Sequence, residues 1–136
     1  MSESASAALK ECIDRIEAAY EFMLSYAARG RRGDNPDDPE GNVRPFLQNA
    51  VAALDRLSAA ADAQAKAVGL EDAVWRPYRE ILAADAQRAR AALALVLAQP
   101  SIGSDLIDNL NASMHVRTLV TDLFLIDGVF DAAAKA

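Results

Sequence analysis

Hydrophobic residues recur along most of this chain at alternating intervals of three and four residues, the spacing of one face of an α-helix. Segments rich in glycine, proline and charge interrupt the pattern. The predicted helices cover about residues 4–29, 43–68, 75–98 and 104–131, with a predicted loop at 30–42. Four such helices favour an all-α fold, and an antiparallel four-helix bundle of up-down-up-down topology is the leading architecture. The long first loop would also permit a crossing connection.

Glycine and proline mark where the predicted helices end or begin. Gly30 follows the first helix, and Gly69 follows the second as expected of a left-handed C-terminal cap. Asn42 is the predicted N-cap of the second helix. Because Pro77 cannot donate a backbone hydrogen bond, we expect the regular part of the third helix to begin near residues 75–77. The loop before the second helix combines prolines, glycines and opposite charges, which predicts a solvated, mobile connector.

The last predicted helix carries two apolar stripes. The first stripe begins with Leu106, Ile107, Leu110 and Met114 and continues through Val120 and Phe124. The second stripe, on another side of the helix, consists of Leu119, Leu123, Ile126 and Phe130. One packed core cannot easily use both sides, so a helix of this kind either lies at the centre of a larger core or meets a partner. We assign the second stripe as the predicted interface.

Length and composition fit a single domain that covers residues 1–136. The hydrophobic fraction is 52% but the aromatic fraction is only 6%, so the apolar content is mostly alanine and leucine, as in packed helices. Arginine outnumbers lysine and alanine is abundant, which suggests a GC-rich bacterial genome.

The acidic balance of the chain limits its partners. A net charge of −6 disfavours nucleic acid and anionic membrane surfaces, whose affinity for proteins comes from clustered Lys and Arg. No apolar run is long enough to span a membrane. Cys12 is the single cysteine, and the first residues do not resemble a signal peptide, so we expect a cytoplasmic protein.

Metal and haem chemistry find little support in the sequence. Di-iron and hemerythrin-like sites need several histidines, and His115 is the only one. Asp108, Asn111 and His115 form a possible polar surface site on one side of the last predicted helix. Asp108 and His115 are seven residues apart, about 10 Å along a helix, which is too far for one metal ion. We therefore predict no metal and no cofactor.

Two charged residues are predicted to point inward. Arg117 falls among apolar residues of the last helix, and Asp85 adjoins the seam of the third helix, at about the height of Tyr20; Tyr78 lies nearby. A buried charge needs a partner, so the simplest interpretation is an internal pair between Arg117 and Asp85 that fixes helix register. The functional alternative is an arginine that receives an anionic ligand or a partner's carboxylate.

These patterns favour a non-enzymatic interaction or accessory protein. We expect it to form a homodimer, or to dock another protein, through the second stripe of the last helix. The alternative is a bundle that binds a small ligand or cofactor at the internal polar site of Arg117, Asp85, Tyr20 and Tyr78. An enzyme ranks third, because the sequence offers no evident set of convergent acids and bases.

Overall fold

The computed structural model describes residues 2–136, and within that range it contains only helices, turns and loops. The elements are α1 (Ser2–Ala27), the short 3-10 helix η1 (Pro39–Gly41), α2 (Arg44–Ala67), α3 (Asp72–Leu97), α4 (Ser104–Ala112) and α5 (His115–Lys135). The all-α class is confirmed. The four-helix architecture is not, because the segment predicted as the last helix forms two helices, α4 and α5.

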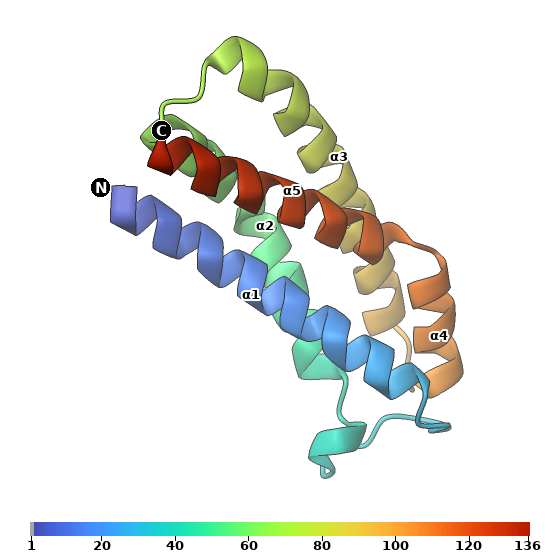
Figure 1. The fold of residues 1–136 in the computed structure, drawn as a ribbon. Helices are drawn as coiled ribbons and strands as arrows, with labels where there is room; N and C mark the ends of the chain where they lie inside the picture. Colours follow the sequence, from blue (N-terminus) through green and yellow to red (C-terminus); the bar gives the residue numbers. More distant parts are fainter. Residues whose placement is uncertain (1) are drawn as a thin grey trace.

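The long helices lie in two layers (Figure 1). α1 and α5 run side by side in opposite directions, with α2 and α3 behind them, and both chain ends lie at the same end of the molecule. α1 contacts α2, α4 and α5, and α3 contacts α2 and α5. The short α4 lies at an angle to α5 at the opposite end, beside the end of α1. None of the described helices is long and apolar enough to cross a membrane.

The core consists of the residues that the three-four spacing selects. From α1 to α3, the largest fully buried side chains are Ile16, Met23, Tyr26, Leu47, Leu57, Leu82 and Leu93. Burial of each large aliphatic side chain contributes roughly 1.5–3 kcal/mol, so these seams supply most of the driving force for packing the helices. Cys12 belongs to the same core, where burial raises the pKa of its thiol and disfavours a reactive thiolate.

The helix end predicted from a glycine agrees with the structure better than the helix start predicted from a polar N-cap residue. Gly69 has a φ of 79°, and the amide of Leu70 donates to the carbonyl of Ala65 at 3.0 Å, which confirms the left-handed cap. The N-cap of α2 is Val43 and not the predicted Asn42. α3 begins at Asp72, and it includes Pro77 within the helix. The proline is tolerated because it lies close enough to the start that only one backbone hydrogen bond is lost.

The connector between α1 and α2 differs from the predicted solvated loop. Asp34 forms an ion pair with Arg44 at 2.7 Å and accepts a hydrogen bond from the amide of Ile102, also at 2.7 Å. Arg44 also donates to the carbonyls of Leu97 and Gln99 beyond α3, at 3.0 and 2.7 Å. Burial alone would raise the pKa of Asp34, but these hydrogen bonds and the Arg44 charge lower it. The connector is therefore tied to the end of α3.

A second set of contacts joins the end of α1 to the start of α4. The Tyr26 hydroxyl donates to the carbonyl of Ile102 at 2.6 Å, and the Ser104 hydroxyl donates to the carbonyl of Tyr26 at 2.7 Å. The amide of Arg31 donates to Ser104 Oγ at 2.8 Å. We call these four residues the α1–α4 junction. It fixes the position of α4, from which α5 follows.

Candidate functional site

The break between α4 and α5 determines which side of α5 faces the core. Met114 adopts the left-handed conformation with a φ of 69°, so the helix cannot continue through it. At the end of α4 the amide of Ser113 donates to the carbonyl of Asn109. At the start of α5 the amide of Thr118 donates to the carbonyl of Met114. The prediction of one continuous helix was therefore wrong, and of the two α5 residues assigned to the first stripe, Val120 is buried but Phe124 is exposed.

The predicted interface stripe belongs to the chain's own core. Its four members, Leu119, Leu123, Ile126 and Phe130, are only 0 to 4% exposed. Leu119, Leu123 and Ile126 pack inside the molecule, and the Phe130 ring lies 5.3 Å from the Trp75 ring of α3. These residues are thus unavailable to a partner. The prediction failed because it assumed that the side of the helix that is buried in α4 is also the buried side of α5.

The exposed side of α5 carries an uncharged stripe instead. Five exposed residues at intervals of three and four, which we call the outer seam, follow its length: Thr118, Thr121, Leu125, Gly128 and Ala132. None of the five is charged. Thr121 Oγ1 donates to the carbonyl of Arg117 at 2.9 Å, so its hydroxyl is satisfied within the helix. Exposed Phe124 and Val129 flank the seam.

Small residues make the middle of the outer seam flat. A side chain added at Gly128 would meet nothing within 4 Å, so the backbone there is open to a neighbour. Leu125, at 54% exposed, stands above the small residues on either side of it. Small positions beside a large apolar one let two helices approach closely and interlock. The spacing could have been found in the sequence, but its outward direction could not be known without the break at Met114.

The expected pair between Arg117 and Asp85 is absent from the described residues, because Arg117 is exposed on α5. Asp85 is half-buried on α3 and forms its ion pair with Arg88 of the same helix, at 3.2 Å. Tyr20 is half-buried and packs against the core. Within residues 2–136, no hydrogen bond connects Tyr20 to Asp85. The internal polar site predicted from the sequence is therefore not assembled as expected.

A different polar cluster links α3 and α5. The Tyr78 hydroxyl donates to Asp122 Oδ1 at 3.0 Å, and the carboxyl group of Asp122 lies beside that of Asp85. Asp122 Oδ2 is buried and finds no donor among the described residues. A proton on one of the two carboxyl groups would satisfy both, because a protonated carboxyl can donate to its neighbour. Sequence reasoning did not single out Asp122, because the side of α5 that faces α3 could not be known without the break at Met114.

The environment of this cluster changes its acidity. Burial, reinforced by the neighbouring Asp85 carboxyl, raises the pKa of Asp122 to about 7 even though the Tyr78 hydrogen bond opposes the shift. Burial and the hydrogen bond to Asp122 raise the pKa of Tyr78 to about 12. The cluster therefore retains a proton close to neutral pH. Such a group can act as a general acid only toward a substrate that reaches it.

The three residues of the possible polar surface site are divided by the helix break. Asp108 is exposed on α4, whereas His115 is the first residue of α5 and is also exposed. Asn111 is half-buried, and its amide donates to the carbonyl of Met23 at 3.3 Å, so it helps to hold α4 against α1. Across the described residues, no group of three His, Cys, Asp or Glu side chains is arranged to bind a metal ion.

Comparison with known proteins adds no relative to this description. No protein-family model matches the chain, and neither a curated protein nor a solved structure matches it significantly. The functional inference therefore depends on the surfaces and buried groups of the chain itself.

Proposed function

We propose that this chain is a non-enzymatic interaction protein that forms a homodimer through the outer seam of α5. One observation supports this most strongly: α5 carries an uncharged, exposed stripe at heptad spacing opposite a complete buried stripe at the same spacing. Exposed apolar surface of this regularity is typical of a helix that packs against a second helix. The acidic charge of the chain supports a protein partner in the cytoplasm over nucleic acid.

The order of residues in the outer seam favours a second copy of the same chain. In an antiparallel pair of α5 helices centred on Leu125, each Leu125 would meet the other one. Thr118 and Ala132, each seven residues from the centre, would then lie opposite each other, and Thr121 and Gly128, four and three residues from it, would lie nearly opposite. Such a contact has the two-fold symmetry of most homodimers, in which the same surface serves both subunits. It also buries no charge from either copy.

The size of the outer seam sets the expected strength of the dimer. The fifteen residues from 118 to 132 span about 22 Å of helix. A contact through one helix of this length falls at the low end of interface sizes, so we expect a dissociation constant in the micromolar range. The alternative partner for the outer seam is another protein with a helix of matching shape.

Sedimentation equilibrium from roughly 10 to 200 µM protein tests the proposal. The unchanged chain should approach a dimer, whereas Leu125→Glu, which places a charge at the centre of the pair, should remain a monomer with an unchanged circular dichroism spectrum. Val74→Glu is the matched control, because Val74 is also apolar and exposed but lies on α3, away from the outer seam. A monomeric unchanged chain across this range would contradict the homodimer, as would equal disruption by both variants.

The ligand-binding alternative has weaker support at the internal polar site. Arg117 was the group expected to receive an anion there, and it is exposed on the other side of α5. Two carboxyl groups and a tyrosine remain between α3 and α5, and one proton between the two carboxyl groups would satisfy both. We therefore do not propose an anionic ligand or a cofactor for this site.

A further inference from the structure

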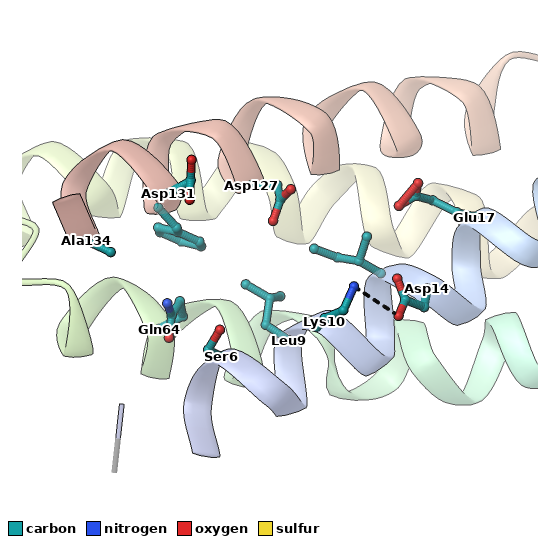
Figure 2. Close-up of a pocket in the computed structure, with 11 residues that line it drawn as sticks. Ser6, Leu9, Lys10, Asp14, Glu17, Gln64, Asp127, Asp131 and Ala134 are labelled. Carbon is teal, nitrogen blue, oxygen red and sulfur yellow. Dashed lines mark ion pairs between the residues drawn. The ribbon is translucent and has the colours of Figure 1, made fainter. Parts of the chain in front are cut away.

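A groove separates α1 from α5 on the side of α5 away from the outer seam (Figure 2). Its volume is about 250 Å³, and the buried apolar side chains of Leu9, Ile13 and Phe130 line it as an apolar floor. One end is closed by Gln64 of α2, near Ser6 of α1. This volume is smaller than a typical drug-sized pocket, so the groove suits a slender ligand.

The rim of the groove has an excess of negative charge. α1 contributes Asp14 and Glu17, and α5 contributes Asp127 and Asp131. Among the described residues, Lys10 is the one cationic side chain that lines the groove, and it pairs with Asp14 at 3.5 Å. Lys135 pairs with Asp131 at 3.0 Å.

Glu17 and Asp127 are left without an ion pair within residues 2–136, and Figure 2 shows them extending toward each other across the gap. Burial is the largest cause that raises the pKa of Glu17, and the nearby carboxylates of Asp14 and Asp127 raise it further. A cation between Glu17 and Asp127 would relieve this repulsion. The groove is therefore electrostatically suited to a positively charged ligand.

Gln64 gives a second and independent indication of a ligand. Only 8% of this residue is exposed, and its Oε1 atom is buried without a donor in the described part of the chain. A buried amide oxygen is normally hydrogen-bonded, because its lost contact with water must be replaced. Since Gln64 lines the groove, a ligand with an N–H group at that end would supply the missing donor.

The distribution of these groups determines the chemical class of the ligand. The carboxylates do not converge on one point in the manner of a metal site, and the floor between them is apolar. Glu17 follows Ser6 by eleven residues, which corresponds to about 16 Å along α1. A ligand of matching form has charged nitrogens separated by methylene groups. Methylene groups would pack on Leu9 and Ile13 while the ammonium groups meet the acids.

We propose that the α1–α5 groove binds a linear aliphatic polyamine. One ammonium group lies between Glu17 and Asp127, the methylene chain lies on the apolar floor, and a terminal ammonium donates to Gln64 Oε1. This site is independent of the proposed dimer, because the outer seam lies on a different side of α5. Binding is therefore expected in the monomeric Leu125→Glu variant as well.

Isothermal titration calorimetry with spermine at low salt tests this site. We expect saturable binding at one site per chain, which Asp127→Asn weakens about tenfold. Gln64→Leu should weaken binding about fivefold without changing the net charge. Asp108→Asn is the matched control for charge, because Asp108 is an exposed acid of α4 outside the groove, and it should change affinity less than twofold.

Several outcomes would overturn the polyamine site. Absence of spermine binding at millimolar concentration would do so directly. Equal weakening by Asp127→Asn and Asp108→Asn, or equally tight binding of Mg²⁺, would mean that the overall negative charge attracts any cation. Binding that Gln64→Leu leaves unchanged would remove the buried amide from the site. Binding of a lysine-rich peptide in place of spermine would identify a protein segment as the occupant.

Discussion

Asp122 is the residue whose protonation depends most strongly on the fold. In the unfolded chain its carboxyl group titrates near 3.8, whereas in the folded chain burial and the Asp85 carboxyl raise the pKa of Asp122 to about 7. Between these values the unfolded state has released the proton and the folded state still holds it. Raising the pH through this window therefore favours unfolding, and the penalty is complete above about pH 7.

Asp122→Asn should remove this penalty. The amide can still accept from Tyr78 through its oxygen and can donate to Asp85 through its nitrogen, so it reproduces the protonated acid. We expect the variant to be more stable than the unchanged chain at pH 8 by about 1–2 kcal/mol, and nearly equal to it at pH 4. Urea denaturation at both pH values measures the difference. Asp108→Asn, at an exposed position, should show no such change with pH, and a constant difference for Asp122→Asn would refute the shared proton.

At the scale of secondary-structure elements, the chain depends on a single residue to redirect its last helical segment. Met114 has no glycine-like freedom, yet it adopts a left-handed conformation that costs an L-residue about 1 kcal/mol. The cost is offset because the break lets the buried face of α4 and the buried face of α5 pack against the same core.

Met114→Gly should consequently stabilise the fold by about 0.5 kcal/mol, since glycine adopts this conformation without the steric penalty. Ser113→Gly is the matched control at the neighbouring position. Ser113 has an ordinary right-handed conformation, and its hydroxyl donates to the carbonyl of Leu110, so its replacement should destabilise the chain by roughly 1 kcal/mol. Chemical denaturation distinguishes the two. Destabilisation by both variants would mean that the side-chain contacts of Met114 stabilise the fold by more than its left-handed backbone conformation destabilises it.

The sequence allowed the buried faces of α1, α2 and α3 to be predicted, because residues such as Ile16, Leu57 and Leu93 recur at helical spacing over many turns. It did not allow the break at Met114 to be predicted, since methionine is a good helix former with no preference for positive φ. Every error about α5 follows from that break. Leu123 was placed outside and Arg117 inside, although the observation that α5 has two apolar sides was correct.

The α1–α5 groove could not have been predicted for a different reason. Glu17 and Asp127 are distant in sequence and each reads as an ordinary surface acid. Only the packing of α1 beside α5 brings them to one rim, and only the position of α2 places Gln64 at its end. The loop residue Asp34 presents the same difficulty, because its partners lie 10 and 68 residues away.

For the whole molecule, the excess of acidic residues opposes the proposed self-association. Each chain carries a net charge of −6, so two copies repel, although the outer seam itself is uncharged. Salt shortens the range of this repulsion from about 10 Å at 0.1 M to about 3 Å at 1 M. The balance between the two effects is set by ionic strength.

The dimer should therefore become stronger as salt is added. We expect its dissociation constant to fall several-fold between 0.05 and 0.5 M NaCl, in sedimentation equilibrium at pH 7.5. Leu125→Glu should stay monomeric at both concentrations. A dimer that weakens with salt would indicate ion pairs across the interface, which the outer seam cannot supply, and would direct attention to another surface.

The α1–α4 junction has a consequence for a chain that emerges from the ribosome one residue at a time. The Tyr26 hydroxyl donates to the carbonyl of Ile102, which is synthesised 76 residues later, whereas the Tyr26 carbonyl accepts both from the neighbouring amide of Arg29 and from the hydroxyl of Ser104, 78 residues later. α1 and α2 can pair as soon as both have emerged, because they are neighbours in sequence. The Tyr26 hydroxyl must stay hydrated until α3 is complete, so the nascent helical hairpin remains open at this end until α4 docks.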